Sequence, residues 1–245
     1  MSLQQELEGK NMRLDKFLVQ AGVCSRSEAK NYIKKGLVSI NDIPCKSSDT
    51  KIDEHRDIIR YKGELIGYQQ YYYYMLHKPA GVITATIDTK DQTVMDLLNE
   101  AQGKDLSPVG RLDKDTEGLL LITNDGELAH FLLSPKRHVD KTYLVHTKHP
   151  VSQEAAKQLI SGVDIGEKEI TKPAKVEIVD KECILLTICE GKFHQVKRML
   201  VAVDNEVTYL KRISFGSLVL DETLPKGAYR ALTEEEIEAL RGCIK

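Results

Sequence analysis

Apolar residues near the start of the chain recur at helical spacing. Four of them fall at positions i, i+3, i+4 and i+7 and form one apolar face: Leu14, Phe17, Leu18 and Ala21. Gly22 ends this first helix. The pair Ser25 and Glu28 is typical of a capping box, so a second helix is predicted to begin there and to end at Gly36. A short strand and a turn over 37–45 complete a small helical module with a hairpin.

From residue 71 onward the pattern changes and strands predominate. A tyrosine-rich strand ends at the turn formed by Pro79 and Gly81. Further strands are predicted over 119–123, 141–147, 174–180, 183–188 and 229–232, and helices over 93–100, 128–134, 152–161, 194–203 and 233–240. Because several strands follow one another as hairpins, we expect an α+β domain whose mixed, largely antiparallel sheet is flanked by helices.

The net charge of −2 conceals a basic head. Between Lys10 and Lys51, nine Lys or Arg stand against four Asp or Glu, a net of +5. Arg26, Lys30 and Lys34 are spaced four residues apart and form a basic stripe on the second helix. This head is either a solvated face or a surface that meets a polyanion.

The segment "GRLDKDTEGLLLITNDG", 110–126, places four acids around an apolar run: Asp113, Asp115, Glu117 and Asp125. A calcium loop is rejected because its twelfth position would be Asn124 and its second half is apolar. Histidines and cysteines show no zinc spacing, and no phosphate-binding glycine motif is present. Turn chemistry explains 124–126 but not Asp113, which is expected to be partly buried and therefore a candidate functional carboxylate.

Two resemblances give these patterns a meaning. The stretch "RLDKFL…SRSEAKNYIKKGLVSIN" resembles the S4 RNA-binding domain, and "GRLDKDTEGLLLITNDG" resembles the signature of the RsuA-type branch of the pseudouridine synthases. "LHKPAGVIT", "KTYLV" and "EGKFHQVKRM" resemble the other motifs of that family. The resemblance implies a tail over 1–11, an S4-like domain over 12–60, a linker over 61–70 and a catalytic domain over 71–245.

The family resemblance also implies the chemistry. It makes Asp113 the catalytic residue, Tyr143 the active-site tyrosine and Lys197 the basic partner of the aspartate, in a reaction that turns uridine into pseudouridine without a cofactor or a metal. The target base must leave its stack, and Arg111 is expected to occupy the space it vacates. Arg198 is the second candidate for the partner of Asp113, and the other acids of the segment are expected to be turn and solvent residues: Asp115, Glu117 and Asp125. The full set of expected RNA-binding residues is Arg111, Arg13, Arg26, Lys30, Lys34, Lys192 and Arg198.

Two segments, "SP…KTYLV" and "EKEITKPA", resemble most the members of the branch that act on 16S ribosomal RNA. The expected partner is therefore 16S RNA or an assembling small subunit. A 23S substrate and a non-enzymatic S4-domain assembly factor stay as alternatives. With no apolar run of membrane length, a polar N-terminus and five cysteines without CxxC spacing, we expect a cytoplasmic monomer with reduced, mostly buried thiols and no membrane contact.

Overall fold

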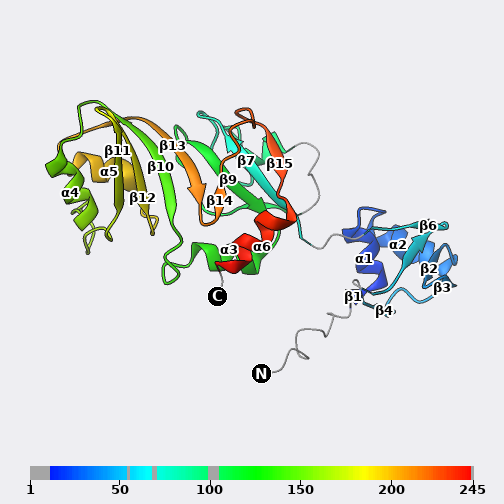
Figure 1. Ribbon diagram of the computed structural model, residues 1–245. Helices are drawn as coiled ribbons and strands as arrows, with labels where there is room; N and C mark the ends of the chain where they lie inside the picture. The colour runs from blue at the N-terminus through cyan, green and yellow to red at the C-terminus, as the bar shows by residue number, and fades with distance from the viewer. Residues whose placement is uncertain (1–11, 54–55, 68–70, 99–104, 244–245) are drawn as a thin grey trace, which may run out of the picture. The chain divides into compact units, whose positions relative to one another are not determined.

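The computed structural model describes residues 12–53, 56–67, 71–98 and 105–243. The chain divides into two compact units, Met1–Gln70 and Tyr71–Lys245 (Figure 1). The predicted tail over 1–11 lies outside the described residues. Within the described part, no helix has both the length and the apolar character of a membrane span.

The N-terminal unit contains the two predicted helices, α1 (Leu14–Gln20) and α2 (Arg26–Lys34). At the start of α2, Glu28 Oε2 accepts hydrogen bonds from the backbone nitrogen of Ser25 at 2.9 Å and from its Oγ at 2.6 Å, as the capping pattern predicts. Leu14, Phe17 and Leu18 are buried, which confirms the predicted apolar face. The core that they form with α2 also includes Ala29, Ile33, Val38, Ile52 and Ile59.

Among the described residues of this unit, six short strands accompany the helices. They are β1 (Met12–Arg13), β2 (Val38–Ile40), β3 (Ile43–Pro44), β4 (Lys51–Ile52), β5 (Ile59–Tyr61) and β6 (Glu64–Leu65). β1 pairs with β4, and the others form a sheet in the order β3-β2-β5-β6. Residues 61–65, which were expected to belong to a linker, instead form a hairpin of this sheet, because Tyr61 pairs with both Val38 and Glu64.

The C-terminal unit is built on one mixed sheet. Its strands are β7 (Tyr73–Lys78), β8 (Ser107–Pro108), β9 (Glu117–Thr123), β10 (Lys141–Thr147), β11 (Lys175–Asp180), β12 (Cys183–Ile188), β13 (Val207–Phe215), β14 (Leu218–Val219) and β15 (Tyr229–Ala231). The order is β11-β12-β10-β13-β9-β7-β15, and all neighbours on this path are antiparallel except β13 and β9. The α+β class and the largely antiparallel sheet are therefore confirmed.

Helices cover both faces of this sheet. They are η1 (Val94–Leu97), α3 (Gly126–Leu133), α4 (Gln153–Ser161), α5 (Gln195–Val201) and α6 (Glu234–Gly242). One core cluster joins Leu119 and Leu121 of β9 to α3 and α6, and the other joins Leu120 and Ile122 to α4 and α5. Figure 1 shows α4 and α5 beside β11 and β12, and α3 and α6 together near the C-terminus. The alternation of β9 thus separates two cores, because successive strand residues face opposite sides.

Strand β13 was not predicted, yet it occupies the middle of the sheet between β10 and β9. Its parallel pairing with β9 brings Arg212 opposite Gly118. Gly118 has φ +108°, and a Cβ added there would lie 2.7 Å from the backbone nitrogen of Arg212. Only glycine permits this close approach of the two backbones.

The cysteine expectation needs a correction. All five are free, but none is buried: Cys243 is exposed and the other four are half-buried. Cys24 and Cys45 only pack against the edge of the N-terminal core. Cys183, Cys189 and Cys243 lie at or just beyond the ends of strands or of the last helix.

Candidate active site

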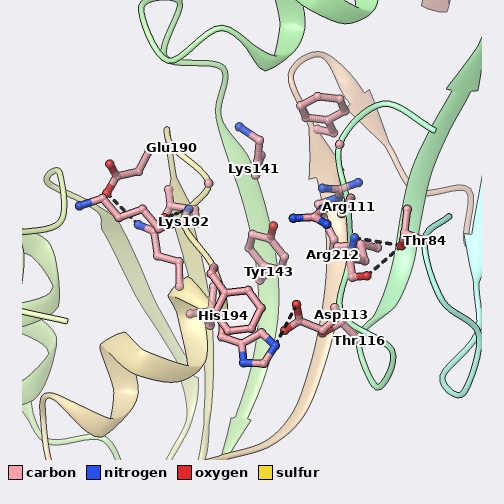
Figure 2. Close-up of a pocket in the computed structure, with 18 of the residues that line it drawn as sticks. Thr84, Arg111, Asp113, Thr116, Lys141, Tyr143, Glu190, Lys192, His194 and Arg212 are labelled. Atoms are coloured by element: carbon pink, nitrogen blue, oxygen red, sulfur yellow. Dashed lines mark hydrogen bonds and ion pairs between the residues drawn. The ribbon is translucent and has the colours of Figure 1, made fainter. Parts of the chain in front are cut away.

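A cavity of about 660 Å³ opens in the C-terminal unit, where β10 and β13 meet the loop before β9 and the loop before α5. Tyr143 of β10 and Arg212 of β13 line it, together with Asp113 from the loop before β9. Figure 2 shows Tyr143 near the middle of the view, with Asp113 and Arg212 on one side of it and Lys192 on the other. The family-implied aspartate and tyrosine therefore line the same cavity, although they are far apart in the sequence.

Asp113 is paired with Lys197 at the start of α5. The Nζ of Lys197 lies 3.1 Å from Oδ2 of Asp113, and the aspartate side chain is 27% exposed. Burial alone would lower the pKa of Lys197, but hydrogen bonds to Asp115 and Asp113 raise it above its ordinary value. The site therefore places a charged ammonium directly beside the carboxylate of Asp113.

Lys197 has a second partner. Its Nζ lies 2.6 Å from Oδ1 of Asp115, whose side chain is 72% exposed. This hydrogen bond from Lys197 lowers the pKa of Asp115, against the smaller effect of burial. Asp115 was expected to be only a turn and solvent residue. The structure corrects this, because its carboxylate shares the cation of the predicted catalytic aspartate.

The other acids of the segment also have defined partners. Glu117 is buried, not solvated as expected: its Oε2 accepts from Tyr209 at 2.7 Å and pairs with Lys226 at 2.7 Å. Asp125 caps α3, since its Oδ1 accepts from the backbone nitrogen of Leu128 at 3.0 Å. Its turn role is confirmed, but its side chain is buried too.

Lys78, at the end of β7, fixes the backbone around Asp113. It is fully buried, and its Nζ donates to the carbonyls of Asp113 at 3.0 Å, Lys114 at 3.3 Å and Thr116 at 2.8 Å. The carbonyl of Pro79 is a fourth acceptor at 3.0 Å, so two of the four carbonyls share one of the three N–H groups. Burial lowers the pKa of Lys78 to about 8, so the group still carries its proton at neutral pH.

The other side of the same loop is held by Thr84. Its Oγ1 donates to the carbonyl of Leu112 at 2.8 Å and accepts from the nitrogen of Leu112 at 3.1 Å (Figure 2). The nitrogen of Thr116 donates to the carbonyl of Asp113 at 3.1 Å and closes a turn. Asp113 is therefore carried by a backbone with bonds on both sides, which preorganises the carboxylate.

Tyr143 lies deepest among the family-implied residues, with 8% of its surface exposed. It stands opposite Arg212 in the pairing of β10 with β13. Side chains alternate between the two faces of β10, and Tyr143 lies on the face that lines the cavity. Its ring forms a flat wall of the cavity close to Asp113 (Figure 2). A flat ring at this depth suits contact with a planar base.

Arg212 is a cavity residue that the sequence pattern did not reveal. It is 2% exposed, its Nε donates to the carbonyl of Leu119 at 2.8 Å, and its Cζ lies 5.1 Å from the ring centre of Phe215. Its Nη2 has no hydrogen-bond partner among the described residues. Burial, reinforced by Arg212, lowers the pKa of the neighbouring Lys141 to about 8. The sequence did hold one sign of a functional residue here, namely two adjacent cations, 211–212, inside a run that is otherwise typical of a strand.

His194 was also missed as a site residue. Its Nε2 lies 3.7 Å from Oδ1 of Asp113, and its backbone adopts a left-handed conformation with φ +49° (Figure 2). In the motif "FHQVK", His194 stands three residues before Lys197. Because α5 begins directly after His194, both side chains lie at the start of the helix and face the same site.

The predicted RNA-binding residues of this unit divide into two groups. Arg111 and Lys192 line the cavity. Arg198 does not: its guanidinium binds Glu167 at 2.9 Å, the carbonyl of Phe193 at 3.1 Å and the carbonyl of Ile165. Arg198 was the second choice as partner of Asp113, and this geometry assigns that pairing to Lys197 instead.

In the N-terminal unit, Arg26, Lys30 and Lys34 are exposed along α2. No ion pair involves them among the described residues. Arg13 differs, because its Nη2 lies 2.8 Å from Oδ2 of Asp15, which is fully buried. Arg13 therefore neutralises a buried acid, while the α2 cations face solvent.

No group of three or more His, Cys, Asp and Glu that could hold a metal ion is found in the described parts of the chain. The cavity instead combines the carboxylates of Asp113 and Glu190 with several cations and several aromatic rings. This set can bind an anionic, ring-bearing ligand and present a carboxylate oxygen to it.

Comparisons with known proteins identify the family. Residues 72–202 match the RNA pseudouridylate synthase family, and residues 12–58 match the S4 domain. The chain is 50% identical over 234 residues to "Uncharacterized RNA pseudouridine synthase YtzG" of Bacillus subtilis, covering 94% of this chain and 98% of that protein. It is 44% identical over 230 residues to "Ribosomal small subunit pseudouridine synthase A" of Vibrio cholerae, covering 94% and 99%.

A solved structure described as "Crystal structure of pseudouridylate synthase" agrees with these matches. It superposes with a TM-score of 0.67 at 42% identity and covers 94% of this chain and 99% of its own. Both parts of the chain and the motifs around Asp113, Tyr143 and Lys197 thus fall within matched regions. The chain therefore belongs to the RsuA-type branch of the RNA pseudouridylate synthase family.

Proposed function

We propose that this protein isomerises a uridine of 16S ribosomal RNA to pseudouridine, with Asp113 as the catalytic residue and without a cofactor. The observation that carries the proposal is the 3.1 Å contact between Asp113 and Lys197 in a cavity of about 660 Å³. That volume lies within the range of sites that take a small organic ligand, and a nucleotide is of this size.

The reaction breaks the bond between N1 of uracil and C1′ of the ribose and forms a bond between C5 and C1′. C5 loses a proton and N1 gains one, so atoms and electrons balance with no oxidant or reductant. A carboxylate near the sugar can attack C1′ or remove a proton from C2′, and both routes need an unprotonated oxygen. The ammonium of Lys197 lies 3.1 Å from Oδ2 of Asp113 and places a positive charge beside that carboxylate.

The remaining roles follow from position. Tyr143, at 8% exposure, stacks on the uracil ring and assists removal of the C5 proton. The target nucleotide must leave its stack to reach this depth, at a cost of a few kcal/mol. Arg111 is exposed and lines the cavity, so it is placed to fill the gap left in the RNA. Lys192 lines the cavity as well and contributes a phosphate contact.

The choice of 16S RNA rests on the relatives. Several proteins that are 41–44% identical over 94% of this chain carry the name "Ribosomal small subunit pseudouridine synthase A". We infer that the substrate is 16S RNA or an assembling small subunit, met in the cytoplasm by a monomer. The S4-like unit adds phosphate contacts through the exposed cations of α2, and specificity comes from RNA shape and single-stranded bases.

The test is base-resolved pseudouridine mapping of 16S and 23S RNA, free and in partly assembled particles. The RNA is incubated with wild-type protein and with Asp113→Asn. We expect one new pseudouridine in 16S that is absent with the variant. A new site in 23S alone would overturn the substrate, and no new site in either RNA would overturn the enzymatic function in favour of an S4-domain binding factor.

A further inference from the structure

Phe193 is an aromatic side chain that the fold leaves in solvent. It is 69% exposed, and it is the single aromatic residue among the strongly exposed large apolar side chains of the described residues. It also lines the cavity that holds Asp113. An exposed apolar ring at a functional cavity marks a contact with a ligand more often than a scattered surface residue does.

The backbone under this ring is held firmly. The carbonyl of Phe193 accepts from Nη1 of Arg198 at 3.1 Å, and the same guanidinium also binds the carbonyl of Ile165. Gln195, 4% exposed, accepts from the nitrogen of Lys192 at 2.8 Å and donates to Glu190 at 2.8 Å. The loop thus presents an exposed ring from a fixed base, which lowers the entropy lost when a ligand binds.

The ring is also part of a continuous series of contacts that leads to the reacting group. Phe193 stacks on His194 with ring centres 3.8 Å apart and planes at 19°, and Nε2 of His194 lies 3.7 Å from Asp113. Only the imidazole separates the exposed ring from the carboxylate. Exposure rises along this series, from 8% for Tyr143 to 27% for the Asp113 side chain, 42% for the His194 side chain and 69% for Phe193. Phe193 therefore stands at the mouth of the cavity and Tyr143 at its floor.

We propose that Phe193 is a stacking platform for the base next to the isomerised uridine. The inference rests on the proposed function, since a uridine that reaches Tyr143 and Asp113 leaves its chain neighbour at the mouth. Cations of the kind that bind phosphates belong to the same cavity, because Lys192 directly precedes Phe193 and Arg111 is another lining residue. Aromatic rings beside cations are the usual platform for single-stranded bases.

The target base itself is a poorer occupant for Phe193. A base on that ring would lie in solvent, beyond the imidazole that separates Phe193 from Asp113, whereas Tyr143 offers a buried ring inside the cavity. Phe193 thus affects RNA affinity and the choice of neighbouring nucleotide, and Tyr143 contacts the reacting base.

The test compares Phe193→Ala, Phe193→Tyr and wild type in binding and in single-turnover pseudouridine formation. The probe is the 16S fragment that contains the modified uridine. Loss of the ring should weaken binding about 5- to 160-fold, the range found for single stacked bases. Phe193→Tyr should stay within about threefold of wild type, because a tyrosine ring stacks as well. Val219→Ala is the matched control, since Val219 is 67% exposed but does not line the cavity.

A second set of RNAs identifies the base. Each neighbour of the target uridine is made abasic in turn. At one of the two positions the abasic RNA should weaken binding to wild type as much as Phe193→Ala does, with no further loss when both changes are combined. Unchanged binding by Phe193→Ala, or losses that multiply at both positions, would overturn the inference. Pseudouridine formation by wild type on intact RNA is scored separately, and its absence would overturn the proposed function instead.

Discussion

Nζ of Lys78 donates a hydrogen bond of 3.0 Å to the backbone carbonyl of Asp113. The lysine belongs to β7 and the aspartate to the loop before β9, so the bond joins two segments 35 residues apart. A fully buried ammonium needs several hydrogen-bond acceptors. Every acceptor of Lys78 is a backbone carbonyl. Lys78 therefore fixes the position of the backbone that carries Asp113, and its charge also interacts with the carboxylates of Asp115 and Asp113.

Lys78→Met should impair both stability and rate. It removes the ammonium that donates to four carbonyls, and a buried carbonyl left unsatisfied, such as that of Thr116, costs about 1–3 kcal/mol. We expect the free energy of unfolding to fall by about 3 kcal/mol or more, and the single-turnover rate to fall about 100-fold as Asp113 moves from its place. Urea unfolding and pseudouridine formation measure the two effects. The matched control is Lys148→Met, an exposed lysine paired with Glu206, which should change stability by less than about 1 kcal/mol. Equal effects of the two variants would contradict the role given to Lys78.

The pH dependence of the rate should show a fall above about pH 8. Burial lowers the pKa of Lys78 to about 8, and loss of its proton removes donors from the Asp113 loop. The free energy of unfolding should change in the opposite direction to the rate as the pH rises. The unfolded lysine has a pKa near 10.4, so between about pH 8 and pH 10 the unfolded state binds more protons and this lysine's contribution to the free energy of unfolding rises.

Lys141 also has a pKa of about 8, lowered by burial and then by Arg212, so it must be separated from Lys78. Rates are therefore measured from pH 6 to pH 9.5 for wild type and for Lys141→Met. A fall that persists with the same midpoint in the variant assigns the titration to Lys78. Disappearance of the fall in Lys141→Met would show that this assignment is wrong.

Asp115→Asn should have a small effect compared with Asp113→Asn. Both carboxylates contact Lys197, but the side chain of Asp115 is 72% exposed, and exposed ion pairs contribute at most about 1 kcal/mol. We expect the single-turnover rate to change by less than about fivefold, whereas Asp113→Asn removes activity. Asp91→Asn is a control of the same kind, because Asp91 pairs with the exposed Lys114 at 2.7 Å. A loss with Asp115→Asn as deep as that with Asp113→Asn would mean that the two acids share the chemistry.

Reversing two charges on α2 should weaken RNA binding without unfolding the N-terminal unit. Lys30 and Lys34 are exposed, and their change to Glu removes two candidate phosphate contacts. The slope of log affinity against log salt should become shallower by about 1.4 to 1.8. Filter binding across a salt series measures this. Lys157→Glu combined with Lys181→Glu makes the same change of net charge on the other unit and should leave the slope nearly unchanged. Equal affinity of Lys30→Glu/Lys34→Glu and wild type at physiological salt would refute the prediction.

The sequence pattern predicted most strands and helices, but it missed β13 for a physical reason. The pairing of β13 with β10 skips Ile213, since Thr142 stands opposite Ser214 and Tyr143 opposite Arg212. This bulge interrupts the alternation, so Arg212 and Phe215, three residues apart, are both buried. A search for period two cannot detect a strand whose phase changes in the middle, especially when it carries two adjacent cations.

Site residues that belong to a family motif could be named from the sequence. Those that reach the cavity only through the folding of distant segments could not. Asp113, Tyr143 and Lys197 were named from family motifs, and the structure brings all three to one cavity. Lys78 was missed because a lysine is rarely fully buried, and nothing local in the sequence shows that carbonyls from a distant loop will surround it. The contact between Lys197 and Asp115 was missed because it depends on how α5 approaches the loop before β9.

The close contact of Gly118 with Arg212 has a consequence for reading genetic data. Any side chain at position 118 would push apart two central strands: β9, which follows the loop of Asp113, and β13, which contains Arg212. A screen for inactive alleles should therefore recover Gly118 beside the catalytic positions, although it offers no functional group. Such an allele would lose activity because the spacing between two backbones changes. A second-site mutation that restores activity would have to restore that spacing within the two strands.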